Sequence, residues 1–279
     1  MTVNIENSNY PIGFALSGGG TRGFAHLGAM KALDERGIYP NVLAGTSAGS
    51  LAAVFYADGY IPDEIFAMLK EFRMRNFLET ALPKEGFFRM TALSAFLEKH
   101  LRAKCFEDLK LPLYVVASDI ELGREQVFSS GDLINPVVAS CSVPIVFAPI
   151  EIDQHYYVDG GVFMNFPVSV IRERCRTIVG INVSPLSTIK YDKSLKCVIE
   201  RTMSYMVGAN SKDERLKCDH LIESEELSRY STFDFKYADE IYAKGYILAS
   251  RYLDKHIIEV DDSNKKPQKH KSLIRRLLE

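Results

Sequence analysis

Short apolar runs alternate with amphipathic stretches along most of the chain, a pattern that indicates an α/β protein. The apolar runs that predict strands or strand-like segments cover residues 12–16, 42–44, 113–118, 124–129, 156–158, 176–183 and 220–222. The stretches with helical spacing cover residues 24–36, 50–57, 61–72, 91–102, 132–140, 195–210 and 238–256. We therefore expect a mainly parallel sheet with helices on both of its faces.

The pattern predicts one globular domain over residues 1–260 and a polar, basic tail over residues 261–279. No internal repeat is found, and no linker is long enough to separate two domains. The tail segment 269–278 is basic and amphipathic, so it could contact an anionic membrane surface. A frayed terminus is the alternative interpretation of the same residues.

Composition narrows the possible functions. The chain has 47% apolar and 25% charged residues, as expected of a globular protein with a sizeable core. A net charge of −2 argues against a nucleic acid as the main partner. The 5 cysteines are scattered without C-x-x-C spacing, which favours reduced thiols in a cytoplasmic protein. We expect no cofactor and no metal.

The N-terminal residues are polar, and they lack the basic and apolar regions of a signal peptide. No apolar stretch reaches the length needed to span a bilayer. We therefore expect a cytoplasmic protein. If its substrate is a lipid, the protein must meet it from the aqueous side and could contact the membrane peripherally.

One glycine-flanked serine has the surroundings of a catalytic nucleophile. Gly45-Thr46-Ser47-Ala48-Gly49 follows an apolar run and precedes a predicted helix. A strand, a Gly-x-Ser-x-Gly turn and a helix together describe a nucleophile elbow, in which glycines remove side chains that would collide with the backbone. The serine would be held at a strained corner near the positive end of the helix.

A second glycine-rich loop, Gly18-Gly19-Gly20-Thr21-Arg22-Gly23, lies between the first predicted strand and helix. Its exposed N–H groups could bind an anion, either as a phosphate loop or as an oxyanion hole. The loop lacks the Gly-Lys-Ser/Thr of a phosphate loop, and the serine turn that follows favours the oxyanion hole. Arg22 could hold the loop, attract an anionic substrate or be a solvated residue of the first helical turn.

Ser47 needs a base, and the best candidate is a carboxylate. None of the 6 histidines lies in a glycine turn at a strand end, although His155 and His220 remain open as alternatives. Asp159 follows an apolar run and precedes Gly160 and Gly161, so it could lie close to another backbone segment. A partly desolvated carboxylate can accept the serine proton and return it to the leaving group. An ordinary turn aspartate is the alternative interpretation.

Apolar residues between positions 73 and 90 interrupt the regular pattern. They belong to an irregular segment that follows the helix predicted at 61–72. Such a segment could form a lid or the wall of an acyl-chain site, or it could simply pack on the core.

Four sequence blocks in this order resemble the patatin-like phospholipases. The blocks are Gly18-Gly19-Gly20-Thr21-Arg22-Gly23, Gly45-Thr46-Ser47-Ala48-Gly49, Ala139-Ser140-Cys141-Ser142-Val143-Pro144 and Val158-Asp159-Gly160-Gly161. Asn165-Phe166-Pro167-Val168 adds a segment similar to the Asn-x-Pro of that family, and the resemblance covers roughly residues 12–255.

The resemblance implies a three-layer α/β/α sandwich and a serine acyl hydrolase that works without histidine. Ser47 and Asp159 would be its catalytic dyad, and Gly18, Gly19, Gly20 and Arg22 would belong to its oxyanion hole. The expected substrate is a phospholipid or another fatty-acyl ester. An acyltransferase and a non-catalytic lipid-binding module on the same fold are the alternatives.

Overall fold

The fold is given by a computed structural model that describes residues 10–72, 90–186, 188, 193–232 and 234–260. The strands are β1 (Tyr10–Leu16), β2 (Val42–Thr46), β3 (Leu113–Asp119), β4 (Arg124–Phe128), β5 (Ile150–Ile152), β6 (His155–Asp159), β7 (Cys175–Asn182) and β8 (His220–Glu223). The α-helices are α1 (Phe24–Glu35), α2 (Ala48–Ala57), α3 (Pro62–Phe72), α4 (Thr91–His100), α5 (Ile134–Ser140), α6 (Val168–Arg172), α7 (Leu195–Arg215) and α8 (Ala238–Leu253). Short 3₁₀ turns lie at Gly20–Gly23, Phe106–Asp108, Gly160–Val162, Glu225–Arg229 and Phe235–Tyr237.

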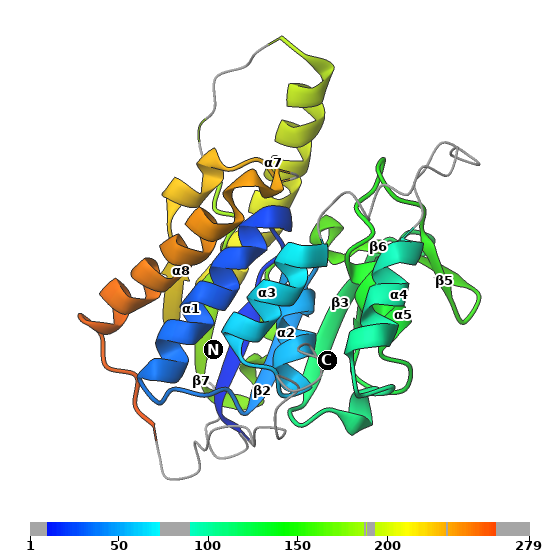
Figure 1. Ribbon diagram of the computed structural model, residues 1–279. Helices are drawn as coiled ribbons and strands as arrows, with labels where there is room; N and C mark the ends of the chain where they lie inside the picture. The colour runs from blue at the N-terminus through cyan, green and yellow to red at the C-terminus, as the bar shows by residue number, and fades with distance from the viewer. Residues whose placement is uncertain (1–9, 73–89, 187, 189–192, 233, 261–279) are drawn as a thin grey trace.

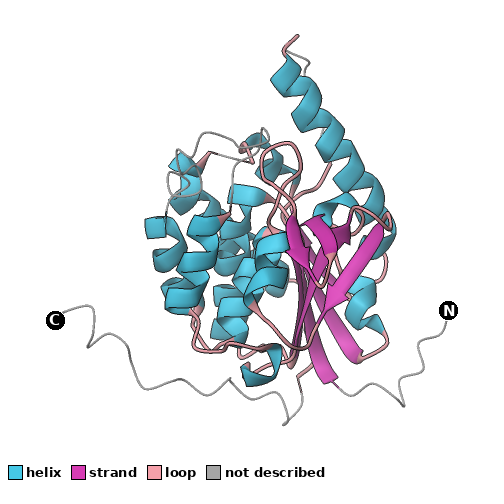
Figure 2. Ribbon diagram, turned by 90° about the vertical axis from the view of Figure 1, so that its right-hand side faces the viewer, coloured by secondary structure: helices cyan, strands magenta, loops and turns pink. Residues whose placement is uncertain are grey.

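The strands form one mixed sheet between two layers of helices. Its hydrogen-bonded neighbours follow the order β5-β6-β3-β2-β1-β7-β8, and β4 also pairs with β3. Strands β3, β2, β1, β7 and β8 are parallel, whereas β4, β5 and β6 are antiparallel to their partners. Helices α1, α2, α3 and α8 lie on one face, and α6 packs on the other beside α7 (Figures 1 and 2). The expected three-layer α/β/α fold is confirmed.

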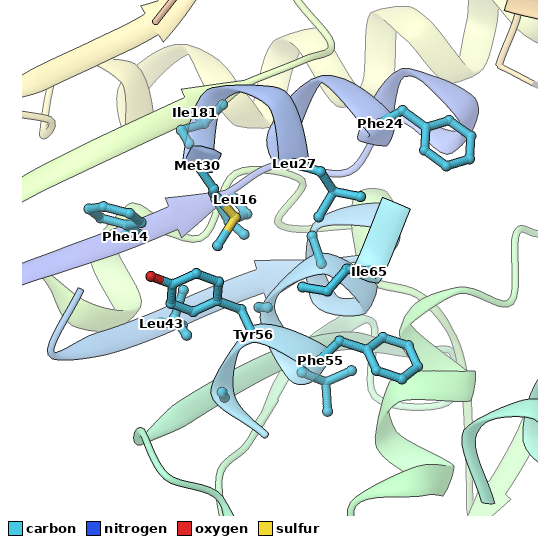
Figure 3. Close-up of a cluster of buried hydrophobic side chains, with 14 of the residues drawn as sticks. Phe14, Leu16, Phe24, Leu27, Met30, Leu43, Phe55, Tyr56, Ile65 and Ile181 are labelled. Atoms are coloured by element: carbon cyan, nitrogen blue, oxygen red, sulfur yellow. The ribbon is translucent and has the colours of Figure 1, made fainter. Parts of the chain in front are cut away.

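The larger core lies between the sheet and the α1–α2 layer. Along β1, Phe14 and Leu16 point into this core, where they meet Leu27 and Met30 of α1 and Phe55 of α2 (Figure 3). The intervening Ala15 belongs to a smaller core on the opposite face, because successive strand side chains alternate between faces. Both faces of β1 are buried, which explains why its sequence reads as a continuous apolar run.

Two strands meet end to end along one edge of β3. Strand β2 pairs in parallel with the first half of β3, and its last pair joins Thr46 to Val116. Strand β6 arrives from the opposite direction, and its last pair joins Asp159 to Ala117. Strand β4 pairs with the same β3 residues on the other edge, so β2 and β6 must share an edge. The residue after β2 and the last residue of β6 are thereby brought together.

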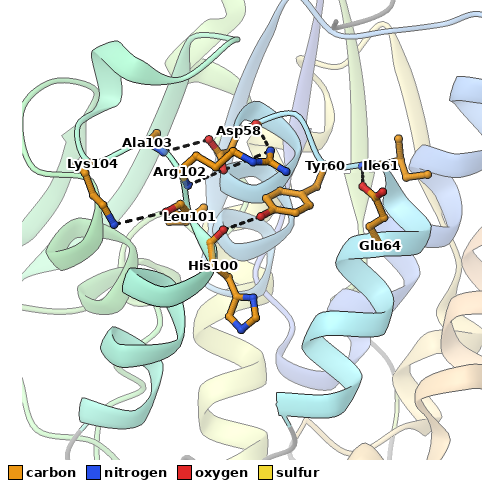
Figure 4. Close-up of polar contacts among 9 residues, drawn as sticks. All are labelled: Asp58, Tyr60, Ile61, Glu64, His100, Leu101, Arg102, Ala103 and Lys104. Atoms are coloured by element: carbon orange, nitrogen blue, oxygen red, sulfur yellow. Dashed lines mark hydrogen bonds and ion pairs between the residues drawn. The ribbon is translucent and has the colours of Figure 1, made fainter. Parts of the chain in front are cut away.

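Polar contacts fix the far end of α2 (Figure 4). The Asp58 carboxylate accepts hydrogen bonds from the N–H groups of Arg102 at 3.0 Å and Ala103 at 3.2 Å. The Tyr60 hydroxyl donates to the His100 carbonyl at 2.6 Å, and the Arg102 guanidinium lies 4.1 Å from the centre of the Tyr60 ring. These contacts join α2 to the end of α4 and hold the helix that begins at the serine turn.

Several boundaries differ from the sequence expectations. Helix α7 continues to Arg215, beyond the expected end at 210, and α8 ends at Leu253, before the expected end at 256. The short strand β5 was not expected. The predicted irregular segment lies outside the described residues over 73–89, as does the predicted tail over 261–279. All 5 cysteines are free, as expected. Within the described ranges, no helix is both long enough and apolar enough to cross a bilayer.

Candidate active site

The strained serine turn expected from the sequence is present between β2 and α2. Ser47 has φ 52° and ψ −123°, a backbone conformation that costs a non-glycine residue free energy and is concentrated at functional sites. The flanking glycines allow close backbone approach. A Cβ on Gly45 would lie 2.7 Å from the Gly49 carbonyl oxygen, and a Cβ on Gly49 would lie 2.3 Å from the Leu16 carbonyl oxygen. Residues larger than glycine would therefore force this turn apart.

The structure brings Ser47 and Asp159 into direct contact. The Ser47 hydroxyl donates a 2.6 Å hydrogen bond to Asp159 Oδ2, and the Gly161 N–H donates to Oδ1 at 2.8 Å. Both residues are buried, with exposures of 8% for Ser47 and 7% for Asp159. Burial raises the pKa of Asp159 to about 6, although the hydrogen bonds from Ser47 and Gly161 oppose this shift. The carboxylate can thus both accept and return a proton near neutral pH.

A second serine, Ser140, fixes the backbone of the Ser47 turn. Its hydroxyl accepts the Ser47 N–H at 2.8 Å and donates to the Val116 carbonyl oxygen at 2.6 Å. Ser140 is the last residue of α5 and is fully buried. It lies in the third of the sequence blocks, but nothing in the spacing of that block indicated a contact with Ser47. The hydroxyl links the serine turn to β3 at the point where β2 and β6 meet.

The glycine loop differs from the expectation at Gly18. The Gly18 N–H donates to the Asn165 carbonyl oxygen at 2.9 Å, so it is not available to stabilise a substrate oxyanion. Gly19 and Gly20 both line the cavity at Ser47. Among the described residues, their N–H groups have no hydrogen-bond acceptor. The donors available for an oxyanion are therefore those of Gly19 and Gly20.

Arg22 helps to hold this loop in place. Its Nη2 donates to the Thr232 hydroxyl at 2.9 Å, and the Thr21 N–H donates to the Thr232 carbonyl oxygen at 2.9 Å. A Cβ on Gly20 would lie only 2.3 Å from that same carbonyl oxygen, so the two segments approach closely. Of the alternatives for Arg22, the contacts support a role in holding the loop. The side chain also lines the cavity.

The described histidines do not reach Ser47. The Nδ1 atom of His155 lies 3.3 Å from Asp119 Oδ2, and the Nδ1 atom of His220 lies 3.1 Å from the Tyr252 hydroxyl oxygen. His26 is buried, and its Nε2–H donates to the Ser17 carbonyl oxygen at 2.8 Å. Burial lowers the pKa of His26 to about 4, so the ring is neutral and supports the strand end before the glycine loop. No described histidine lines either cavity at Ser47.

Two cavities of different character meet at the serine. The larger has a volume of about 300 Å³ and the smaller about 100 Å³, and Gly20, Ser47, Val143 and Thr232 line both. The smaller cavity has an apolar wall made by side chains of α1, α2, α3, the loop after α5 and the 3₁₀ turn at Phe235–Tyr237. These residues are Phe24, Leu51, Leu69, Phe72, Phe147 and Phe235. One side of the larger cavity is formed by α7.

One group of described side chains has the donor types of a metal site. Ligand atoms of Asp119, Glu121 and His155 lie within 4.8 Å of one another. These residues line neither cavity at Ser47, so they take no part in the site described above.

Comparisons with known proteins connect this site to a family. The sequence model of the family described as patatin-like phospholipase matches residues 14–171. The chain is 25% identical to lysophospholipase NTE1 of Kluyveromyces lactis, over 91% of this chain but 20% of that protein. It is 32% identical to the uncharacterized protein YqhO of Bacillus subtilis, over 66% of this chain and 75% of that one.

A human relative and a solved structure agree with these matches. The human patatin-like phospholipase domain-containing protein 6 is 31% identical over 62% of this chain and 13% of that protein. The crystal structure of VipD from Legionella pneumophila is similar in fold, with a TM-score of 0.52 and 16% identity over 89% of this chain and 67% of that one. The chain thus spans about a fifth of the Kluyveromyces protein and less of the human one. The family match covers more than half of its residues and includes Ser47 and Asp159, and this chain belongs to the patatin-like phospholipase family.

Proposed function

We propose that this protein hydrolyses a fatty-acyl ester of a lipid with a Ser47–Asp159 dyad. The observation that carries the proposal is the 2.6 Å hydrogen bond from the Ser47 hydroxyl to the Asp159 carboxylate. The bond is buried and lies at the junction of two cavities that no described histidine lines. A base already in contact with a strained nucleophile meets the geometric requirement for nucleophilic catalysis.

In the proposed mechanism, Asp159 accepts the proton of Ser47 while Oγ attacks the ester carbonyl carbon. The N–H groups of Gly19 and Gly20 bind the oxyanion, and a donor of this kind contributes about 3–4 kcal/mol to the transition state. The alcohol departs with the proton from Asp159 and leaves an acyl-enzyme on Ser47. Asp159 then takes a proton from water, the hydroxide oxygen attacks the acyl carbon, and the fatty acid leaves as Ser47 regains its proton.

The cavity walls and the relatives support the proposed substrate class. The smaller cavity has an apolar wall suited to an acyl chain. Relatives named lysophospholipase and patatin-like phospholipase support a phospholipase A, lysophospholipase or esterase activity. We further propose that the protein works in the cytoplasm and contacts the membrane surface peripherally, since its substrate resides there. An intact, hydrogen-bonded dyad favours this activity over a non-catalytic lipid-binding role.

The test is loss of both activity and labelling in Ser47→Ala. We expect hydrolysis of p-nitrophenyl butyrate to fall at least about 1,000-fold, because the nucleophile is absent while the fold remains. A fluorophosphonate probe should label the wild-type protein and not this variant. Ser94→Ala is the matched control, since Ser94 lies on α4, donates to the Met90 carbonyl oxygen and lines neither cavity. Full activity in purified Ser47→Ala would refute the dyad.

A further inference from the structure

The larger cavity has a cationic wall. Three arginines line it, namely Arg22, Arg201 and Arg229, and Asp159 is the only carboxylate among the described residues that do so. The Asp159 carboxyl is itself held by Ser47 and Gly161. Arg229 forms an ion pair with Glu240 at 2.7 Å. The wall therefore carries a positive charge that its own lining does not neutralise.

Arg201 is the arginine best suited to bind an anion there. Arg201 contacts Tyr205, which lies one turn further along α7. The Arg201 Nη2 donates a hydrogen bond to the Tyr205 hydroxyl at 3.0 Å. The guanidinium carbon lies 4.6 Å from the centre of the Tyr205 ring. Among the described residues, no carboxylate pairs with Arg201. A guanidinium held by an aromatic ring and an uncharged hydroxyl keeps donors free for a planar or tetrahedral oxyanion.

The position of α7 sets the distance between Arg201 and the dyad. Asn210 donates from its side chain to the Gly161 carbonyl oxygen at 2.9 Å, and a Cβ on Gly161 would lie 3.6 Å from Val207. The second half of α7 is thus attached to Gly161, which lies two residues after Asp159 in the chain. The first turns of α7 extend away from the sheet (Figure 1). Arg201 precedes Val207 by six residues, which is roughly 9 Å along the helix axis.

We propose that Arg201 binds the phosphodiester of a single-chain phospholipid whose acyl chain enters the smaller cavity. This inference rests on the proposed function, because it places the ester between the two cavities at Ser47. The apolar wall takes the chain, and the cationic wall takes the headgroup phosphate. Arg201 is then a specificity residue for lipid esters that carry a phosphodiester over those that do not.

The experiment compares two esters that share an acyl chain but differ in the headgroup. Palmitoyl lysophosphatidylcholine carries the phosphodiester and monopalmitoylglycerol does not, and both are presented in mixed micelles of a nonionic detergent. Arg201→Gln should lower kcat/KM about tenfold for the lysophospholipid, through KM, and leave the glyceride unchanged. Arg201→Lys should recover part of the loss. Lys212→Gln is the control, because Lys212 is exposed on the same helix and lines neither cavity.

Further arms separate the possible causes of a loss. An equal loss on both lipids in Arg201→Gln would overturn the proposal, as would a loss in Lys212→Gln of the same size. Hydrolysis of p-nitrophenyl butyrate in all three variants reports the dyad separately, so a protein inactive on every ester refutes the proposed function instead. Glycerophosphocholine should inhibit that reaction in the wild type more strongly than inorganic phosphate. Equal inhibition would assign the site to free phosphate and overturn the headgroup assignment.

Discussion

The buried Asp159 carboxyl should make the active protein less stable than an inactive variant. In Asp159→Asn a neutral amide replaces a carboxylate that is charged at working pH. The amide retains an oxygen for the Gly161 N–H, which donates to Asp159 Oδ1 at 2.8 Å. Unlike the carboxylate, it carries no charge in a site where the residue is only 7% exposed. The variant should therefore fold more stably while its hydrolytic activity is lost.

The magnitude follows from the shifted pKa. Burial raises the pKa of Asp159 from its ordinary value of 3.8 to about 6, so the folded protein holds the proton more tightly than the unfolded chain does. The protonated group contributes stability that is fully present below about pH 4 and is lost as the pH rises through 6. At pH 8 the ionised carboxylate then costs about 3 kcal/mol. In a chain of 279 residues this corresponds to roughly 5 °C in Tm.

The assay is thermal unfolding of both proteins at several pH values between 4 and 8. The Tm difference should be small at pH 4 and should increase in favour of Asp159→Asn through pH 6. Asp153→Asn is the matched control, because Asp153 is exposed in the turn between β5 and β6 and its positive φ of 50° also suits asparagine. A higher Tm for the wild type than for Asp159→Asn at pH 8 would refute the reasoning. A Tm difference between the two proteins that does not change with pH would also refute it.

Two further predictions concern turnover. The kcat/KM for p-nitrophenyl butyrate should rise with pH through about 6, because Asp159 accepts the serine proton only when it is ionised; a profile that is flat from pH 5 to 8 would contradict this. Leu51→Trp should lower kcat/KM for palmitoyl esters at least about tenfold relative to acetyl esters, because the indole would fill the smaller cavity that Leu51 lines. Equal effects on the two chain lengths, measured with p-nitrophenyl esters, would exclude that cavity as the acyl site.

Local chemistry explains why so much of the fold could be predicted. The strands at β1, β2, β3 and β7 are buried on both faces, and their apolar runs differ clearly from the helical spacing around them. The serine turn was equally recognisable, since a positive φ at Ser47 requires small neighbours within a few residues. The helix expected over 132–140 begins at Ile134, and the nearby Asp132 carboxylate accepts the Asn135 N–H at 3.0 Å. Each of these features depends on residues close together in the chain.

Features that depend on distant residues could not be predicted in the same way. The Gly18 N–H donates to the carbonyl oxygen of Asn165, 147 positions further along, so the loop sequence could not show that this donor is occupied. Thr232 contacts Arg22 across 210 positions and was not singled out. The cationic wall requires α7 to lie beside Gly161, and its amphipathic pattern does not specify that neighbour. Such contacts become visible only when the chain is folded.

The contact between Ser47 and Asp159 depends on a feature of sheet topology that neither motif contains. In the proposed mechanism a carboxylate can serve as the base only if its strand ends where the strand before the serine ends. Strand β6 ends there because it runs antiparallel to β3 on the edge used by β2. The two strand ends leave little space between them. A Cβ on Gly160 would lie 2.3 Å from the Val116 carbonyl oxygen and 2.9 Å from the Thr46 methyl group. The glycine after Asp159 is therefore needed for strand approach. Asp159 itself ends β6 and enters a 3₁₀ turn, so Asp-Gly here does not form the hairpin turn that the dipeptide alone favours.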